Sequence, residues 1–286
     1  MKKIDLNEWV KSGEGFEADS YNNTKDDSVI LKLFRPNILK SRIEDSFNAA
    51  IEYEKIGVLT PKAYEMVEVD GRIGVIFERI KDKISLYRMF VNNHELAEEV
   101  ATMFGDSLRE FHAKTIDKSK AISRIANLKA ITSGMIHISD FISDDKKDIL
   151  SKKVLSFFDK FESEAEEPNL AMGDCHIGNV ILSHDKLYFI DLSSLQYGSP
   201  HIDLGWVFSG YDNPLVDAAV PKEEMIPAEY KNRFLDKFKS VYFKGKSADF
   251  IEEEIKKSKK CGQIQDLLLH IYISKNVEAI EKILEI

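Results

Sequence analysis

The stretch from Leu170 to Trp206, LAMGDCHIGNVILSHDKLYFIDLSSLQYGSPHIDLGW, constrains the fold more than any other part of this chain. Acidic and amide side chains stand at Asp174, Asn179, Asp191 and Asp203, and only short apolar runs separate them. Oxygen-bearing side chains beside buried strands are costly to leave unpaired. We therefore expect this cluster to bind a metal, a backbone segment or a substrate.

The apolar runs in this stretch indicate a short β-hairpin. Residues 180–182 and 187–190 are apolar or aromatic, and a polar turn at His184-Asp185 lies between them. Burial of the two strands would leave the polar ends of the hairpin, Asn179 and Asp191, facing one point. The pattern thus predicts that two oxygen ligands converge there.

This arrangement is typical of phosphoryl transfer, which requires an acceptor-orienting carboxylate, oxygen ligands for Mg²⁺ and a cation on the phosphates. Protein kinases use an Asp, an Asn five residues later, and a second Asp after a short hairpin. Asp174 and Asn179 have this spacing, and Asp191 ends the hairpin. Lys32, inside the strand-like run VILKLF far upstream, supplies the cation.

These motifs together resemble the signature of aminoglycoside phosphotransferases, choline kinases and related small-molecule kinases. The superfamily pattern is His-Gly-Asp, four residues, Asn, then Ile-Asp and a later Asp; here it reads MGDCHIGNVIL, YFID and HIDLGW. The segments GVLTPKAYE, FERI and LREFHAKT resemble further landmarks of that superfamily. The resemblance extends from about Gly13 to Trp206.

The resemblance implies an α+β, two-lobed protein-kinase-like fold. A small N-terminal lobe, residues 1–80, would hold an antiparallel sheet, one helix and the nucleotide. A larger, mostly helical lobe, residues 81–286, would carry the catalytic loop and the acceptor site. The local patterns agree, since the Asp70-Gly71 turn predicts a hairpin and the apolar spacing from Leu96 to Phe111 predicts a long helix.

Roles follow from the resemblance position by position. Asp174 resembles the catalytic base, Asn179 and Asp191 resemble the Mg²⁺ ligands, and Lys32 resembles the phosphate-binding lysine. The segment SGEGFEADSY, residues 12–21, resembles the loop over the phosphates, although a plain turn also explains its glycines.

Two further nucleotide contacts are expected from the same resemblance. A glutamate of the first helix should pair with the lysine, and Glu44 is our choice, with Glu52 and Glu54 as alternatives. Backbone groups from Glu78 to Ile80 should meet the adenine.

Two departures from the superfamily pattern bear on activity. Met172 stands where the superfamily has His, and Leu192-Ser193 follows the second Asp in place of Phe-Gly. No Ala-Pro-Glu segment follows Asp191, which disfavours a protein substrate. The loss of His motivates one alternative, a catalytically weak, pseudokinase-like nucleotide-binding regulator.

Other polar residues of the motif have structural interpretations. Asp203 is expected to cap a helix and to anchor the loop, rather than bind metal. His176 is expected to hold the catalytic loop through a backbone hydrogen bond, and His112 to pack or cap at its helix end. We expect no zinc site at Cys175-His176, because no second pair stands at ligand spacing.

Composition narrows the function class. The net charge of −9 without a basic stripe disfavours nucleic-acid binding, and no apolar run approaches the roughly 18 residues of a membrane span. The first residues lack a signal-peptide pattern, and the two cysteines suit a reducing compartment, so we expect a cytoplasmic protein.

The sequence thus predicts an ATP- or GTP-dependent, Mg²⁺-requiring kinase that phosphorylates a small hydroxylated molecule. An aminoglycoside, an amino-alcohol and a sugar-like acceptor all remain open, as does the oligomeric state. A cationic acceptor is allowed by a group of acidic residues near the expected acceptor pocket: Asp212, Asp217, Glu223, Glu224 and Glu229.

Overall fold

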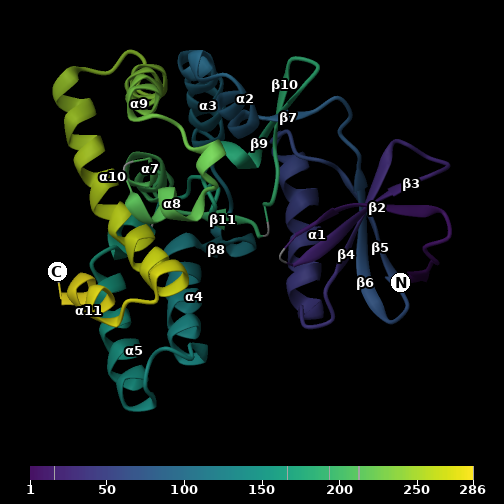
Figure 1. Cartoon of the computed structure of the whole chain (residues 1–286), viewed down its shortest axis with the longest axis horizontal. Coiled ribbons are helices and arrows are strands. Elements are labelled where there is room, and N and C mark those ends of the chain that lie inside the picture. Colours follow the sequence, from purple (N-terminus) through teal and green to yellow (C-terminus); the bar gives the residue numbers. More distant parts are fainter. Residues whose placement is uncertain (16, 166, 193, 212, 286) are drawn as a thin grey trace. The chain divides into compact units, whose positions relative to one another are not determined.

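The computed structural model describes residues 1–15, 17–165, 167–192, 194–211 and 213–285 (Figure 1). Contacts within the chain define two compact units, each with its own core. Unit 1 comprises Met1–Leu86 and Gly178–Leu195, and unit 2 comprises Tyr87–Ile177 and Gln196–Ile286. The functional division at residue 80 stays a prediction.

Unit 1 is built on a six-stranded sheet. Its strands run in the order β1 (Lys2–Lys3), β5 (Ala63–Val69), β6 (Arg72–Glu78), β4 (Val29–Phe34), β3 (Ala18–Asn23) and β2 (Trp9–Glu14). All neighbours are antiparallel except β1 and β5. The predicted hairpin at Asp70-Gly71 is confirmed, and both turn residues have positive φ (49° and 80°), as a tight two-residue hairpin turn requires.

The two faces of this sheet are covered differently. Successive strand residues point to opposite faces. Leu31 and Leu33 of β4 belong to one apolar cluster, whereas Phe34 packs with Ile43 of the single helix α1 (Lys40–Lys55). Lys32 precedes Phe34 by two residues in β4, so the two side chains point to the same face of the sheet, the face that α1 covers.

Unit 1 also contains the second predicted hairpin. Strands β9 (Val180–Ser183) and β10 (Lys186–Phe189) pair antiparallel, and β7 (Ile84–Ser85) pairs with β9 on its other side. His184 and Asp185 both have positive φ (46° and 61°), which confirms the turn. Val180 and Phe189 are buried, so the apolar runs do hold the hairpin in place.

Unit 2 is almost entirely helical. Its α-helices are α2 (Leu86–Asn92), α3 (Ala97–His112), α4 (Arg124–Ile138), α5 (Asp144–Asp159), α6 (Glu162–Ala165), α7 (Pro200–Gly210), α8 (Pro214–Ala219), α9 (Ala228–Tyr242), α10 (Ala248–Leu269) and α11 (Val277–Glu285). Shorter elements are η1 (His94–Leu96), η2 (Lys118–Lys120), η4 (Lys222–Glu224), η5 (His270–Ser274), β8 (Ile122–Ser123) and β11 (Gln196–Tyr197), while η3 (Ile177–Asn179) joins the units in sequence. The helix predicted to end near His112 is confirmed as α3.

A close crossing of α7 and α10 organises unit 2, and the two helices lie against one another (Figure 1). A Cβ atom at Gly205 of α7 would stand 2.7 Å from the backbone nitrogen of Gly262 and 2.8 Å from the carbonyl oxygen of Ser258. Only glycine fits such an approach. The crossing fixes α7, the helix that carries Asp203 and Trp206.

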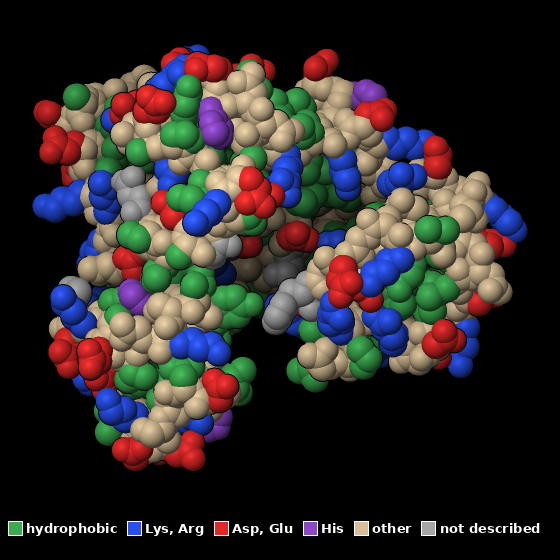
Figure 2. Space-filling view, viewed as in Figure 1, with side chains coloured by type: hydrophobic (Ala, Val, Ile, Leu, Met, Phe, Trp, Pro, Cys, Tyr) green, Lys and Arg blue, Asp and Glu red, His purple; other side chains and the backbone are tan. Residues whose placement is uncertain are grey.

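The described helices include none that is both long and apolar enough to cross a membrane. On the face shown in Figure 2, described Lys and Arg side chains intermingle with Asp and Glu. The chain therefore presents charges of both signs on that face, in keeping with its composition.

Candidate functional site

Unit 1 brings together two of the residues predicted to bind the nucleotide and its metal. The Nζ atom of Lys32 lies 2.7 Å from Oδ1 of Asp191, although 159 residues separate them in the sequence. Lys32 also lies over the ring of Phe77, 6.0 Å from its centroid. The pair brings together the residue predicted to bind phosphate and the residue predicted to bind the metal.

The backbone of Asp191 has an unusual conformation. Its φ is +58°, in the left-handed region that few residues other than glycine adopt. Aspartate tolerates this region better than most residues, and such conformations occur in tight turns as well as at functional sites. The residue with this backbone is the one whose carboxylate contacts Lys32.

Asn179 begins the same hairpin. Its side chain is buried, and its carbonyl oxygen accepts a hydrogen bond of 2.9 Å from the backbone nitrogen of Ile190. That bond sets Asn179 beside the residue that precedes Asp191. The predicted convergence of the two hairpin ends is therefore present in the backbone.

Sequence reasoning missed a residue that holds this segment. The hydroxyl of Tyr53 donates a hydrogen bond of 3.0 Å to the carbonyl oxygen of Ser194, three residues after Asp191. Tyr53 is fully buried on α1, in line with Ile43 and Ala50 on the face that packs against the sheet. The helical apolar spacing could have identified that face, but it carries no signal for the partner.

The predicted glutamate partner of Lys32 is not the residue that contacts it here. Glu44 pairs with Lys40 one turn earlier on α1, at 3.2 Å. The alternatives have other partners as well: Glu52 contacts Lys55 and Glu54 contacts Lys62. The assignment of Glu44 thus stays a prediction for the nucleotide-bound enzyme.

The segment predicted to meet adenine, residues 78–80, follows β6. The backbone nitrogen of Glu78 donates to the carbonyl oxygen of Lys62 at 2.8 Å, and a Glu78 carboxylate oxygen accepts from the backbone nitrogen of Lys62 at 3.3 Å. Within the described part of unit 1, the backbone nitrogen of Ile80 has no hydrogen-bond partner. It is the donor in this segment that a base could use.

Lys83 lies within electrostatic range of both members of the Lys32–Asp191 pair. The pKa of Lys83 is lowered because its ammonium is partly withdrawn from water and faces the charges of Lys32 and Arg79. Its side chain as a whole remains exposed. Cations held near one another in this way are stabilised by an anion, and a nucleotide phosphate is such an anion.

Unit 2 contains the loop that ends at Asp174, and Asp203 holds its backbone. The two carboxylate oxygens of Asp203 accept hydrogen bonds from the backbone nitrogens of Met172 (2.5 Å) and Gly173 (3.2 Å). The same carboxylate lies 3.1 Å from Nε2 of the buried His112. The predicted anchoring is confirmed, but the predicted capping role is wrong: Ser199 is the N-cap of α7.

A buried arginine completes the support of this loop. Arg124, at the start of α4, donates from Nη2 to the carbonyl oxygen of Gly173 and from Nη1 to Oε1 of Gln196, the latter at 3.2 Å. Gly173 has a φ of +93°, which glycine adopts without strain. The backbone nitrogen and the carbonyl oxygen of Gly173, directly before Asp174, are therefore both hydrogen-bonded.

His176 contacts the side chain of Asp174 rather than only its backbone. Nε2 of His176 lies 3.2 Å from Oδ2 of Asp174, and both side chains are exposed. Next to them, Cys175 is buried, and burial raises the pKa of its thiol well above the usual value. A neutral thiol is a poor nucleophile, so Cys175 is not a candidate nucleophile, and the catalytic role of Asp174 stays a prediction.

A cavity of about 340 Å³ in unit 2 opens beside this loop. Asp174 and His176 line one part of it, and residues of α2, α3, α7, α8, η4, α9 and α10 contribute to the rest. Its volume suits a small molecule. Unit 2 therefore has the predicted catalytic carboxylate, Asp174, at the edge of a pocket.

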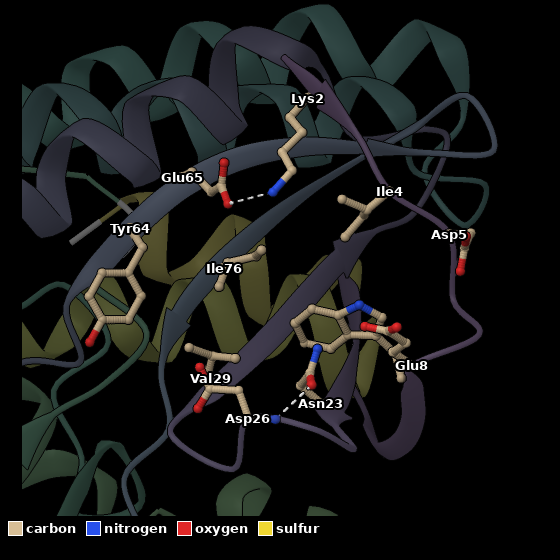
Figure 3. A pocket seen from close by; sticks show the side chains of 11 residues that line it. Lys2, Ile4, Asp5, Glu8, Asn23, Asp26, Val29, Tyr64, Glu65 and Ile76 are labelled. Carbon is tan, nitrogen blue, oxygen red and sulfur yellow. Dashed lines mark hydrogen bonds and ion pairs between the residues drawn. The ribbon is translucent and has the colours of Figure 1, made fainter.

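A larger cavity of about 550 Å³ lies in unit 1 (Figure 3). Ile76 and Val29 line it and belong to the apolar cluster on the sheet face opposite Lys32. The ion pair between Lys2 and Glu65, drawn in Figure 3, also borders it. None of the predicted catalytic or binding residues contributes to its lining.

The donor set fits Mg²⁺ better than a transition metal. Among the described residues, no three His, Cys, Asp or Glu side chains gather closely enough to hold a metal by themselves. Mg²⁺ in nucleotide enzymes needs only one or two protein oxygens, because phosphate and water oxygens complete its shell. The carboxylate of Asp191 and the amide of Asn179 meet that requirement.

Comparison with known proteins agrees with this chemistry. The model of the family described as "Phosphotransferase enzyme family" matches residues 9–224. No curated protein matches the chain. The solved structure of the gentamicin complex of APH(2'')-IIa has a TM-score of 0.57 and 14% identity, covering 98% of this chain and 90% of that chain.

Two other solved structures are equally similar. Aminoglycoside phosphotransferase APH(3'')-Id from Streptomyces rimosus, in complex with ADP and streptomycin, has a TM-score of 0.57 and 14% identity over 89% of this chain and 92% of that one. ADP-bound aminoglycoside phosphotransferase APH(2'')-Ib has a TM-score of 0.58 and 14% identity, with 98% and 92% covered. The predicted α+β, protein-kinase-like fold is therefore confirmed.

Proposed function

This chain belongs to the phosphotransferase enzyme family, and we propose that it moves the γ-phosphoryl group of ATP or GTP to a hydroxyl of a small molecule. The observation that carries the proposal is the 2.7 Å contact between Lys32 and Asp191. Phosphoryl transfer needs a cation and a metal-binding carboxylate at one point, and the contact between Lys32 and Asp191, 159 residues apart in sequence, supports these roles.

Each residue has a defined part in the proposed reaction. The ammonium of Lys32 binds phosphate oxygens of the nucleotide, and the backbone nitrogen of Ile80 offers a donor to the base. Asn179 and Asp191 would hold Mg²⁺, which supplies positive charge beside the phosphate oxygens when bound. The Lys32–Asp191 contact keeps both charged groups close to their working positions before the nucleotide arrives.

Asp174 acts on the acceptor. Its carboxylate accepts a hydrogen bond from the acceptor hydroxyl and orients the oxygen toward the γ-phosphorus. A bond forms between that oxygen and phosphorus as the bond from phosphorus to the bridging oxygen breaks, and the hydroxyl proton passes to Asp174. Asp203 and Arg124 keep the backbone of this loop in place. In the superfamily pattern a His, which stands where this chain has Met172, helps to position the loop.

The alternative of a catalytically weak regulator rests on Met172 alone. The family match gives it no support. We assign nucleotide binding to residues 1–80 with the β9–β10 hairpin, and acceptor binding to the helical remainder.

Replacement of Asp174 by Asn tests the proposal. Nucleotide consumption is measured with a panel of hydroxylated molecules, and nucleotide affinity is measured separately by calorimetry. We expect the Asp174→Asn variant to lose roughly 10²–10⁴-fold in turnover, because a positioned acid–base group contributes that much, while nucleotide affinity changes little. Asp185→Asn, at the hairpin turn, is the matched control.

A variant that retains more than about a tenth of the wild-type turnover would refute the role of Asp174. Failure of the wild-type protein to bind ATP or GTP with Mg²⁺ would refute the function itself.

A further inference from the structure

The cavity of unit 2 is mainly apolar, which narrows the acceptor of the proposed reaction. Its lining includes six large apolar side chains from several elements: Phe104, Trp206, Val216, Val220, Met225 and Ile226. Phe104 is fully buried, and Val207 beside Trp206 is nearly so. A molecule that fills this space must bury apolar surface of its own.

The acidic side chains at this cavity are already paired with cations of the chain. Oδ1 of Asp217 lies 2.5 Å from Nζ of Lys231, whose side chain is only 12% exposed. Glu224 lies 2.6 Å from Nη1 of Arg88 and accepts a hydrogen bond of 3.2 Å from the hydroxyl of Tyr87. Both carboxylates are therefore neutralised without a ligand.

The charge count of the cavity follows directly. Three acidic side chains line the cavity, and Asp217 and Glu224 are paired with Lys231 and Arg88. The third, Asp174, is the proposed acceptor-orienting residue and lies beside His176. Glu223 and Glu229 do not line the cavity, and Asp212 lies outside the described residues.

Two aromatic rings of the cavity, those of Trp206 and Tyr87, are poorly suited to an ammonium group. The guanidinium of Arg124 lies 5.9 Å from the ring centroid of Trp206, and that of Arg88 lies 6.0 Å from the ring centroid of Tyr87. A ligand cation at these rings would share them with a fixed like charge. Cation recognition by aromatic cages depends on rings whose negative faces are available.

Two buried polar atoms of the lining point to a neutral polar group in the ligand. The hydroxyl of Tyr211 and Oε1 of Gln265 have no hydrogen-bond partner within the described chain, and both residues line the cavity. Buried polar atoms are rarely left unpaired. Burial also raises the pKa of Tyr211 well above its usual value, so its hydroxyl stays protonated.

We propose that the acceptor is an uncharged, compact alcohol with an apolar body and a further neutral polar group that bonds to Tyr211 and Gln265. This inference rests on the proposed phosphotransferase function and names its substrate class. It sets the chain apart from the structures solved with gentamicin and streptomycin, because those ligands carry several positive charges.

A matched pair of alcohols tests the charge preference. Choline and 3,3-dimethylbutan-1-ol have the same shape, and they differ in one positive charge. Trp206 reports occupancy of the cavity, because Trp9 is the other tryptophan of the chain and can be replaced by Phe. Binding of each probe, and of kanamycin, is followed by Trp206 fluorescence in the Trp9→Phe protein with Mg²⁺ and ADP.

We expect 3,3-dimethylbutan-1-ol to bind at least tenfold more tightly than choline, and kanamycin to leave the fluorescence unchanged over the same concentrations. Equal or tighter binding of choline or kanamycin would overturn the proposal. The absence of a response to the neutral alcohol up to its solubility would overturn it as well. Neither result affects the Mg²⁺-nucleotide measurement that tests the function itself, so the two failures are distinguishable.

A charge variant tests the cause. Lys231→Met removes the cation that neutralises Asp217. The ratio of the affinity for 3,3-dimethylbutan-1-ol to the affinity for choline should therefore fall at least tenfold. Lys239→Met is the control, because Lys239 lies on the same helix and pairs with Asp236 rather than with a cavity residue. An unchanged ratio in a folded Lys231→Met protein contradicts the proposal. If that variant does not fold, the wild-type comparison still decides.

Discussion

Replacement of Asp191 by Asn isolates the charge proposed to hold Mg²⁺. Asn has the shape of Asp and tolerates the left-handed backbone that residue 191 adopts, with φ of +58°. The substitution therefore removes the charge without adding backbone strain. ATP with Mg²⁺ should stabilise the wild-type protein strongly and the variant weakly.

The size of the effect follows from two contributions. The Lys32–Asp191 pair is 39% and 54% exposed, and exposed ion pairs contribute about 0–1 kcal/mol, so the ligand-free variant should unfold within a few degrees of wild type. At a nucleotide concentration 100 times its dissociation constant, binding stabilises the folded protein by about 2.7 kcal/mol. In a chain of this size that corresponds to a melting shift of roughly 4–5 °C.

The assay is a melting series for each protein with ATP alone, Mg²⁺ alone and both together. Asp191→Asn should remove most of the increment that requires both. Asp185→Asn is the control: it changes the same residue type, also at positive φ, at the turn of the same hairpin. An undiminished increment in Asp191→Asn would show that the metal is bound elsewhere, and the role assigned to this hairpin would fail.

Two further predictions concern unit 2. Gly205→Ala should destabilise the protein by roughly 1–3 kcal/mol in denaturant unfolding, because the added Cβ would meet the backbone of α10. At Gly134 an added Cβ meets nothing within 4 Å, so Gly134→Ala should be neutral or stabilising by about 0.5–1 kcal/mol. Equal effects of the two substitutions would contradict the close crossing of α7 and α10. Burial lowers the pKa of His201, but two carboxylates within 3.0 Å outweigh burial and raise the pKa. The stability lost in His201→Gln should therefore be greatest below about pH 6.5 and should vanish as pH rises through the folded pKa. A pH-independent difference would refute the charged pairing.

Residue patterns were sufficient where neighbours in sequence decide the structure. Both hairpins were predicted from two-residue turns between apolar strands, and the turns at Asp70-Gly71 and His184-Asp185 have the expected positive φ. The spacing of Asp174, Asn179 and Asp191 indicated the phosphotransferase family, and hairpin geometry alone brings the backbone at Asn179 close to that before Asp191. The helix from Ala97 to His112 followed from its apolar spacing.

The partners of the site residues were decided by packing between distant segments. The sequence indicated Lys32 and Asp191 separately, but their contact depends on the β9–β10 hairpin packing with the first 86 residues. It favoured Glu44 as the partner of Lys32, whereas a charge on an exposed helix face pairs with its nearest neighbour, here Lys40. Tyr53 carried no local signal for the carbonyl that it binds.

The acceptor pocket shows the same division between local pattern and tertiary contact. A sequence records that Asp217 and Glu224 are acidic, and from that alone a cationic acceptor is as reasonable as any other. Whether those charges attract a ligand depends on the cations brought beside them, and folding places Lys231 and Arg88 there. Composition determined which charges the chain has. The tertiary structure decided which of those charges a ligand in this pocket would meet, because Coulomb interactions depend on distance and burial rather than on position in the chain.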